Sequence, residues 1–538
     1  MLTIKKTQYI KLFFTLLLLL GSISSSYSQK IPDRRETSLK FAKLLFLIEN
    51  YYVDTVNLGK ITDKAIVAAL KSLDPHSSYL SKKDLKVETE RLEGSFDGIG
   101  IVFQIYQDSI MVVSPIPGGP SDKVGIQAGD RIVKIDDIEA TGDKVNNKFV
   151  FDNLRGEKGS KVTLSIVRKG NKKPTDYTVT RDKIPLYSMD AAYMLTNKIG
   201  YIKLNRFARN TVKEYKKAID SLQNIGLKSL VLDLRGNSGG YLSTAIELTS
   251  QFIPKGKLVV FTEGEHTRKN EFRALGNGDF EDGKLIVLIN EGSASASEIV
   301  SGAIQDWDRG IIMGRRSFGK GLVQQPFPLT DGSQIRLTIS RYHTPSGRCI
   351  QRSYAEGTEK YRKDIVNRIK NGELTNKDSI HFPDSLKYKT ENGRIVYGGG
   401  GIMPDIFIPW DSTEFTSLYS DYIRKGVFNQ FIISYLQKEK TNLVKKYPNF
   451  NDFQKSFKIN NKMMDAFLEI GKKEEIEKKE DEFKRSENLI KLQIKALIAQ
   501  RLFTQREYYQ VINEEDETIH KAIELIKSAD GFDKLKNN

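Results

Sequence analysis

The sequence predicts a multidomain α/β protein with helical regions at both ends and a β-rich module inserted before the core. Three observations lead to this fold class. The chain has 538 residues, enough for three or four domains of roughly 100–200 residues each. Residues 185–345 alternate apolar strand candidates with amphipathic helix candidates, which is typical of a buried, largely parallel sheet. Residues 94–182 instead carry a run of short strand candidates, which indicates a separate compact module.

The N-terminus has the three parts of a secretory signal peptide. Lysines precede the apolar run Leu12–Leu20, and small residues follow it up to Ser28. We therefore expect a signal peptide at 1–28, a mature chain that starts near Gln29, and export to the periplasm or cell envelope. The alternative is that the apolar run is kept as an uncleaved membrane anchor.

Helical patterns flank the core. Residues 29–93 place apolar side chains at helical spacing and form the predicted N-terminal helical region. The core is expected at 183–410, with a buried sheet built from the strand candidates GYIKLN, KSLVLDLR, KLVVFTEG, KLIVLINE and GIIMGR. Within the core, the polar stretch 346–397 is interpreted as a surface excursion. Residues 411–538 contain many opposite charges four residues apart, which predicts a C-terminal helical region.

The chain is basic, with 84 Lys and Arg against 68 Asp and Glu and a formal net charge of +16. The lysines are interleaved with acidic residues, which indicates solvated helices. The sequence contains no zinc-knuckle spacing, RNP-like aromatic pattern or Arg-rich arm, so we expect no nucleic-acid partner. The single cysteine, Cys349, excludes an intrachain disulfide, so core packing must hold the fold together.

A run of small residues follows the apolar strand candidate that ends at Asn290, and a helix candidate begins directly after it. A serine at such a turn lies beside free N–H groups that can stabilise an oxyanion. The residues alone do not separate Ser293, Ser295 and Ser297. None of the five histidines lies in a Ser–His signature, so a lysine with a lowered pKa is the alternative base. Lys320, between two glycines after a strand candidate, is the candidate.

The motif G-S-A-S-A-S-E followed by F-G-K-G resembles the carboxy-terminal processing (tail-specific) peptidases, which are Ser–Lys serine proteases. The resemblance implies a crotonase-like protease core with a PDZ-like β-rich domain inserted before it. It also implies Ser295 as nucleophile and Lys320, 25 residues later (320 − 295 = 25), as general base. Family members orient this lysine through a residue that matches either Asp306 or Gln324 here, and the choice stays open.

The stretch LVLDLRGNSGG resembles the loop of this family that completes the oxyanion hole. The resemblance implies one oxyanion N–H on Ala296 and the other on Gly239 or Gly240. The motifs LDPHSSYL and GGGIMPDI also match family signatures, and we expect them to have structural roles. His76 in the first of them is interpreted as a packed histidine.

The segment SFDGIGIVFQI resembles the carboxylate-binding loop and strand of a PDZ domain, which we place at 94–182. The resemblance implies that Gly98, Ile99 and Gly100 bind the C-terminus of a substrate, while the neighbouring strand edge pairs with its tail. Arg155, in the motif after the second PDZ helix, is expected to link tail binding to the protease site.

The resemblance therefore implies an exported serine endopeptidase that recognises C-terminal tails and works through an acyl-enzyme. We expect no cofactor and no metal ion. The expected partners are protein substrates with accessible C-termini, with an adaptor protein or a homo-oligomer left open. The alternatives are a non-catalytic binding scaffold of the same fold, an acyl-CoA enzyme of the wider crotonase-like group, and a hydrolase that uses Cys349 and His343.

Overall fold

The computed structural model describes residues 34–106, 108–168, 170–171, 173–528 and 531–533. The predicted signal peptide therefore lies outside the described residues. The chain divides into two compact units, Met1–Leu70 and Lys71–Asn538. In the part that the structure describes, no helix has the length and apolar character needed to cross a membrane.

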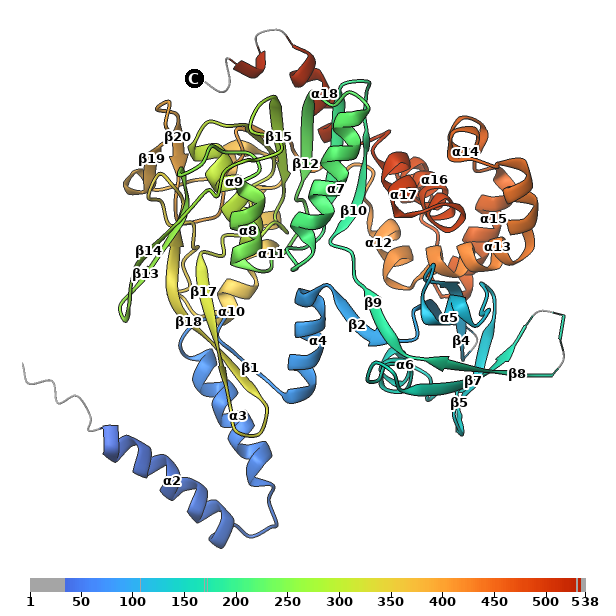
Figure 1. The fold of residues 1–538 in the computed structure, drawn as a ribbon, viewed down its shortest axis with the longest axis horizontal. Helices are drawn as coiled ribbons and strands as arrows, with labels where there is room; N and C mark the ends of the chain where they lie inside the picture. The colour runs from blue at the N-terminus through green and yellow to red at the C-terminus, as the bar shows by residue number, and fades with distance from the viewer. Residues whose placement is uncertain (1–33, 107, 169, 172, 529–530, 534–538) are drawn as a thin grey trace, which may run out of the picture. The chain divides into compact units, whose positions relative to one another are not determined.

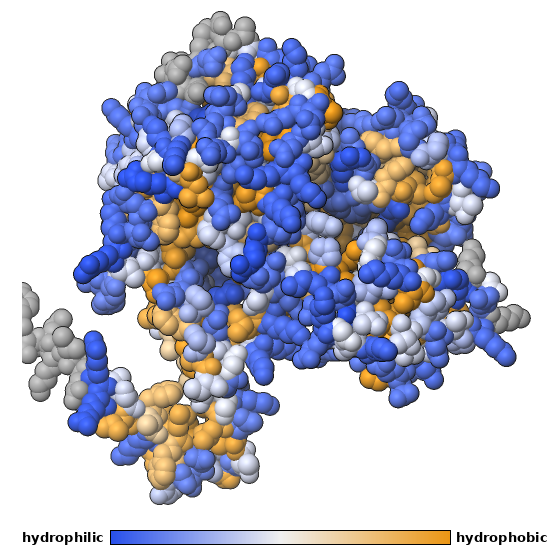
Figure 2. All heavy atoms as spheres, in the orientation of Figure 1, coloured by the Kyte–Doolittle hydropathy of each residue, from blue (hydrophilic) through white to orange (hydrophobic). Residues whose placement is uncertain are grey.

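The first unit consists of helix α2 (Arg34–Tyr51) and almost all of helix α3 (Leu58–Lys71). None of the residues of α2 is buried. Its large apolar side chains are exposed, as the orange surface over these helices in Figure 2 shows. They include Leu39, Phe41, Leu44, Phe46, Leu47 and Tyr51.

The centre of the second unit is a six-stranded sheet in the order β10-β11-β12-β15-β16-β21. All neighbouring strands are parallel except β10, which runs antiparallel to β11. The strands are β10 (Met189–Met194), β11 (Ile199–Leu204), β12 (Ser229–Asp233), β15 (Lys284–Ile289), β16 (Ile311–Gly314) and β21 (Ile406–Phe407).

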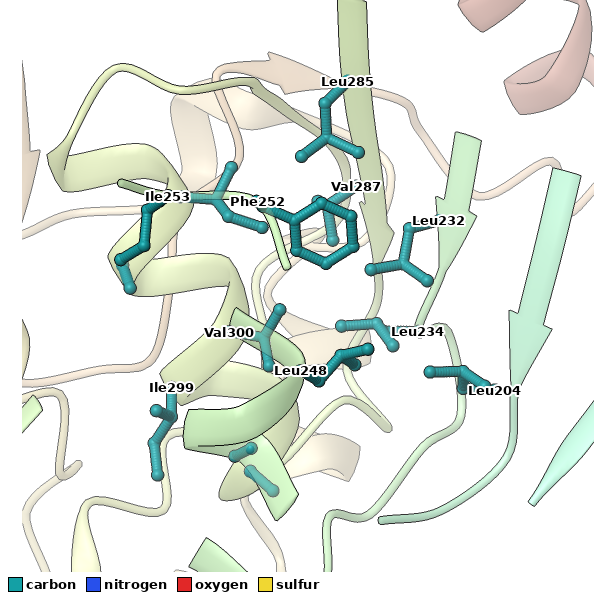
Figure 3. Close-up of a cluster of buried hydrophobic side chains, with 14 of the residues drawn as sticks. Leu204, Leu232, Leu234, Leu248, Phe252, Ile253, Leu285, Val287, Ile299 and Val300 are labelled. Atoms are coloured by element: carbon teal, nitrogen blue, oxygen red, sulfur yellow. The ribbon is translucent and has the colours of Figure 1, made fainter. Parts of the chain in front are cut away.

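Helices cover both faces of this sheet (Figure 1). One face packs against α7 (Thr211–Asn224), α8 (Leu242–Thr249) and α9 (Ala296–Asp306) through a large buried apolar cluster. Figure 3 shows side chains from the strands meeting those from α8 and α9. The other face packs against α18 (Glu517–Lys527). Strands β11 and β12 are buried along their whole length because both faces of the sheet are covered.

A second, antiparallel sheet has the order β1-β18-β13-β14, with β17 paired to β18. The candidate KLVVFTEG, expected in the parallel sheet, is β13 of this sheet, so that expectation was wrong. An apolar run does not reveal its partner strands. The strands are β1 (Ser78–Leu80), β13 (Leu258–Gly264), β14 (Thr267–Arg273), β17 (Leu322–Pro328) and β18 (Gln334–His343).

The β-rich module contains the sheet β3-β4-β5-β7-β8, with β6 paired to β5, and is joined to helix α4 through the pair β2–β9. Its core is a separate apolar cluster. The elements are α4 (Lys82–Glu93), β2 (Ser95–Gly98), β3 (Ile101–Tyr106), β4 (Ser109–Pro115), α5 (Pro120–Lys123), β5 (Arg131–Ile135), β6 (Ile138–Glu139), α6 (Asn147–Leu154), β7 (Lys161–Val167), β8 (Thr175–Thr180) and β9 (Asp182–Pro185).

The polar stretch 346–397 was expected to be a surface excursion, but part of it is buried. It buries Arg348, Arg368 and Arg394 against carbonyl and carboxylate oxygens of the core, and Arg352 against Asp364 of the same stretch. Arginine is usually exposed, so the sequence suggested a surface stretch although the structure buries several of its guanidinium groups. Its elements are α10 (Thr358–Arg362), α11 (Asp364–Lys370), η1 (Lys377–Ser379), η2 (Asp384–Leu386), β19 (Lys387–Lys389) and β20 (Ile395–Tyr397).

The C-terminal region is helical, and most of it has its own apolar cluster. Helix α18 instead packs on the parallel sheet, so this last helix belongs to the core structurally. The other helices are α12 (Ser417–Arg424), α13 (Val427–Lys446), α14 (Phe450–Ser456), α15 (Asn461–Lys473), α16 (Glu480–Leu502) and α17 (Gln505–Ile512).

Candidate active site

Ser295 occupies a tight turn between β15 and α9. Its φ of 54° and ψ of −111° are a conformation that residues with a side chain rarely adopt. Such strain concentrates at functional sites, and the nucleophilic serine of α/β-hydrolases lies on a strained strand-to-helix turn of this kind. The N–H groups of the first turn of α9 lie next to it.

The three serines of this segment are in different environments. The Ser293 hydroxyl is buried and donates to the Leu234 carbonyl (2.8 Å), and the Ser297 hydroxyl is buried and donates to the Asn237 carbonyl (2.8 Å). Ser295 is partly exposed. The flanking hydroxyl groups therefore hold the turn to the neighbouring loop, and only Ser295 faces solvent.

The buried carboxylate of Glu298 joins Ser295 to the loop that carries Lys320. It accepts the backbone N–H of Ser295 (2.8 Å) and the backbone N–H of Lys320 (2.9 Å). It also accepts the Gly319 N–H (2.7 Å) and the Ser317 hydroxyl (2.5 Å). Burial raises the pKa of Glu298, while these hydrogen bonds act in the opposite direction.

Tyr342 of β18 makes a second connection between the two segments. Its buried hydroxyl lies 2.5 Å from the Lys320 carbonyl and 3.2 Å from the Ser295 carbonyl. Sequence reasoning missed both Glu298 and Tyr342. Glu298 was detectable, because Ser-x-x-Glu before an apolar helix is the capping-box pattern. Tyr342 carries no such local signal.

The environment of Lys320 disfavours its charged form. Burial lowers the pKa of Lys320 and the charge of Arg336 lowers it further, whereas the charges of Glu298, Asp74 and Glu88 raise it. The net shift is downward, as a lysine base requires. Burial and the charge of Lys320 together lower the pKa of His76 to about 4.

The loop after β12 lies against the Ser295 turn. A Cβ on Gly239 would be 3.0 Å from the Ala296 nitrogen and 2.9 Å from the Ser295 Cβ, so only glycine leaves the space beside that N–H open. The Gly239 N–H itself donates to the Asn237 side chain (2.9 Å). In the described part of the chain, the N–H groups of Ala296 and Gly240 have no acceptor.

The structure does not place Asp306 beside Lys320. Asp306 is the last residue of α9, which has 11 residues and is therefore about 16 Å long, whereas Ser295 precedes its first residue. Its carboxylate pairs with the buried Arg348 (2.7 Å). The Gln324 amide, on β17, donates to the Thr338 hydroxyl (3.2 Å), and no described hydrogen bond joins it to Lys320.

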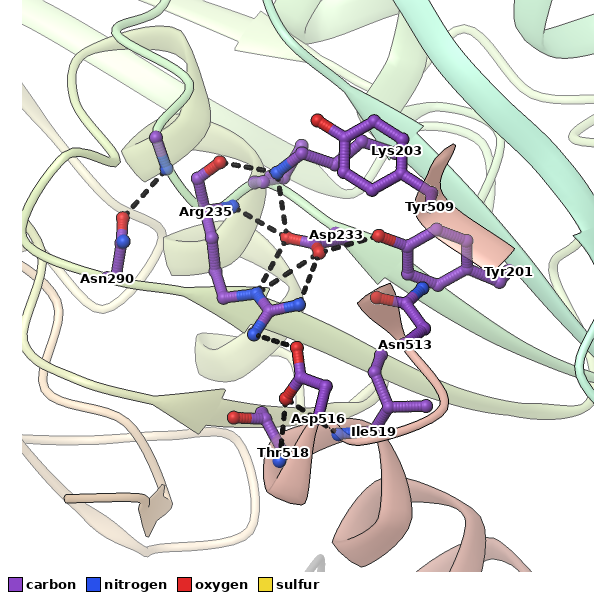
Figure 4. A network of polar contacts seen from close by, with 12 residues as sticks. Tyr201, Lys203, Asp233, Arg235, Asn290, Tyr509, Asn513, Asp516, Thr518 and Ile519 are labelled. Carbon is purple, nitrogen blue, oxygen red and sulfur yellow. Dashed lines mark hydrogen bonds and ion pairs between the residues drawn. The ribbon is translucent and has the colours of Figure 1, made fainter. Parts of the chain in front are cut away.

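An ion network centred on the buried Asp233 supports the base of the Gly239 loop (Figure 4). Arg235 binds both carboxylate oxygens of Asp233 and also Asp516 (2.8 Å), which caps the N-terminus of α18. Lys203 and Tyr201 donate to Asp233 as well. The charges of Arg235 and Lys203 lower the pKa of Asp233 against the effect of burial. The network anchors the Gly239 loop to α18, the last helix that the structure describes in full.

The expected carboxylate loop of the β-rich module links β2 to β3. The Ile99 side chain is buried and Gly100 has a φ of 73°. Among the described residues, the N–H groups of Ile99 and Gly100 have no acceptor, while the Ile99 carbonyl accepts from Ser121. Gly98 lies in the β2–β9 pair. Strand β3 is an edge strand, so one side of its backbone is open to another strand.

Arg155 lies where the module meets α4. Its guanidinium stacks between the rings of Phe96 (4.8 Å) and Phe151 (4.7 Å). It also pairs with Glu90 of α4 (2.7 Å), whose pKa is raised by burial. The structure thus places Arg155 between the β-rich module and the helix that leads into it.

Comparison with known proteins identifies the family. The chain is 40% identical over 317 residues to a carboxy-terminal-processing protease of Bartonella bacilliformis, covering 58% of this chain and 72% of that protein. It is 34% identical over 335 residues to the carboxy-terminal processing protease CtpB of Bacillus subtilis, covering 62% of this chain and 69% of that protein. The chain belongs to the carboxy-terminal processing protease family.

Individual regions of this protease match three family descriptions. Peptidase family S41 matches residues 198–365, the PDZ domain matches 98–179, and a family of unknown function (DUF8443) matches 418–504. A solved photosystem II D1 C-terminal processing protease is 29% identical with a TM-score of 0.33, covering 58% of this chain and 90% of that one. The predicted fold class and the predicted serine-type peptidase are confirmed.

Proposed function

We propose that the protein is an exported endopeptidase that cleaves proteins recognised by their C-terminal tails, with Ser295 as nucleophile and Lys320 as general base. One observation carries this proposal. Glu298 and Tyr342 bind the backbones of both residues, so the strained serine turn and the lysine loop form one unit. Residues 1–28 act as the signal peptide of the exported chain.

The proposed reaction is acyl transfer. Neutral Lys320 takes the proton of the Ser295 hydroxyl, and the Ser295 oxygen attacks the scissile carbonyl carbon. The N–H groups of Ala296 and Gly240 donate to the oxyanion, since the Gly239 N–H is already used by Asn237. The leaving amine takes the proton from Lys320, and water then hydrolyses the ester. Gln324 remains the candidate that orients Lys320, because Asp306 lies at the far end of α9.

The β-rich module, proposed to span 94–182, binds the substrate tail. Its unpartnered N–H groups on Ile99 and Gly100, next to Gly98, would receive the terminal carboxylate, and the open edge of β3 would pair with the tail. Arg155 then connects tail binding to α4 through Glu90.

The test compares model proteins that differ only in their last residues, digested by the full-length enzyme and by Ser295→Ala and Lys320→Ala. We expect both variants to lose cleavage and the intact enzyme to trap an acyl-serine detectable by mass spectrometry at acidic pH. Cleavage by either variant at more than about one hundredth of the normal rate contradicts the assignment, because a missing nucleophile or base costs far more than that. Cleavage that ignores the tail contradicts the role of the β-rich module.

A further inference from the structure

The loop 316–320, which ends at Lys320, is held from two sides. Its N–H groups at Gly319 and Lys320 donate to the Glu298 carboxylate. Its carbonyl groups from residue 316 to 319 accept hydrogen bonds from the polar stretch 346–397, and that of Lys320 accepts from Tyr342. The loop therefore has the negative charge of Glu298 on its N–H side and a second charge on its carbonyl side.

That other charge is Arg368 of α11, whose side chain is 2% exposed. Its guanidinium donates to the carbonyls of Ser317 (2.8 Å) and Phe318 (3.3 Å) and reaches that of Arg316 (3.5 Å). One planar group thus binds three consecutive carbonyls just before Lys320, a task that suits the fixed fork of arginine. The next carbonyl, of Gly319, accepts the backbone N–H of Arg352.

The charge of Arg368 persists under working conditions. Burial and the nearby charges of Arg316 and Arg352 lower the pKa of Arg368 to about 10, against the opposing effects of Asp364 and Glu373, so the guanidinium stays protonated at neutral pH. Its Nε forms an ion pair with Asp364 (2.8 Å), which also binds Arg352. These contacts fix the direction of the guanidinium.

We propose that Arg368 is a positioning residue for catalysis, which holds the lysine loop in register with the Ser295 turn. The inference rests on the proposed role of Lys320 as general base. Arg368 does not touch the reacting atoms, and it lies just beyond the residues 198–365 that match the peptidase family. A functional role thus falls to the stretch 346–397, which was expected to be a surface excursion.

The test is Arg368→Lys in the full-length protein, with an internally quenched peptide that has a free C-terminus as substrate. Lysine keeps the charge but cannot bind three carbonyls in one plane. We expect kcat to fall roughly 100-fold with KM changed less than about two-fold, because an ångström of misplacement costs about that much. We also expect the acid limb of the kcat/KM profile to move to higher pH, since a displaced Lys320 is better hydrated.

Arg394→Lys is the matched control. Arg394 is in the same stretch and 7% exposed, but it binds Asp308 and Asp405 (2.6 Å each), away from the lysine loop. We expect its kcat to stay within about three-fold of normal and its acid limb to stay in place. Equal effects of the two substitutions on kcat and on the acid limb overturn the inference.

Two further variants separate the possible failures. Asp364→Asn leaves Arg368 in place but loosens its orientation, and it decides the question if Arg368→Lys does not fold. We expect a smaller fall in kcat with the same direction of the pH shift, and an unchanged kcat and acid limb overturn the inference.

Lys320→Ala tests the proposed function itself. If Lys320→Ala is inactive while Arg368→Lys behaves like Arg394→Lys, only the inference about Arg368 fails.

Discussion

Replacing Glu298 by glutamine tests whether one carboxylate holds the proposed nucleophile, Ser295, and the proposed base, Lys320, together. The Oε2 atom accepts from Ser295 and Lys320, and the Oε1 atom accepts from Ser317 and Gly319. A glutamine amide supplies only one acceptor oxygen. The less costly orientation places its NH₂ group toward Ser317, whose hydroxyl can rotate, and leaves the Gly319 N–H unpaired.

The magnitude follows from these contacts. An unpaired buried N–H costs about 1–3 kcal/mol, and the two hydrogen bonds kept by the amide oxygen lose their charge assistance. Removing a buried negative charge offsets part of this loss. We expect the free energy of unfolding to fall by about 1–3 kcal/mol, which leaves a domain of ordinary stability folded. We expect kcat to fall roughly 100-fold, because the Ser295 turn and the lysine loop lose their common acceptor.

The assay measures kcat and KM on a tailed peptide alongside urea unfolding. Glu507→Gln is the control, because Glu507 is also buried and caps α17 at Thr504, in a capping box like that of Ser295 and Glu298. We expect Glu507→Gln to lose similar stability and to keep its kcat. A Glu298→Gln enzyme with kcat within about three-fold of normal would refute the argument that Glu298 aligns the two residues.

Three further predictions concern charges near the site. Arg336→Met should raise the pKa of Lys320 and move the acid limb of kcat/KM to higher pH, whereas Arg341→Met on the same strand should leave the limb in place. His76 is partly buried, and burial together with Lys320 lowers its pKa to about 4 in the folded state. Because it protonates more readily in the unfolded chain, the free energy of unfolding should rise by up to roughly 3 kcal/mol from pH 4 to 6.5, and His76→Gln should flatten that rise in urea titrations. Asp516→Asn keeps the N-cap of α18 but breaks the ion pair with Arg235, which is worth up to about 1 kcal/mol. We therefore expect kcat to fall by at most roughly five-fold, and a larger fall in assays of the folded variant contradicts this.

The sequence predicted the parts of the site that are local in the chain. Ser295 and its neighbours lie in one short run, and the strand-to-helix pattern around them was visible from the periodicity. The separation of Ser295 from Ser293 and Ser297 needed either a family resemblance or the structure. The structure distinguishes them by what their hydroxyls do, since the flanking two are buried and bound to carbonyls. Residue type and spacing alone do not predict which of the three hydroxyl groups is buried.

The supporting groups could not be predicted, because they reach the site from distant parts of the chain. Tyr342 comes from the end of strand β18, and Arg368 comes from a stretch whose polarity suggested exposure to solvent. Asp306 was a candidate because its spacing from Ser295 matches that of a carboxylate in some family members. The helix between them carries the two residues to opposite ends, and Asp306 neutralises the buried Arg348 instead.

These placements have a common physical cause. A lysine base needs a low pKa, so few negative charges can lie close to its amine. A mobile lysine loop would be fixed most simply by a salt bridge to that amine, but such a bridge would raise the pKa and keep the lysine protonated. The structure fixes the loop through its backbone instead, with Glu298 on the N–H side and Arg368 on the carbonyl side. In the described part of the chain, the amine of Lys320 then has no dedicated carboxylate partner, and its position is set by groups that bind only the peptide units around it.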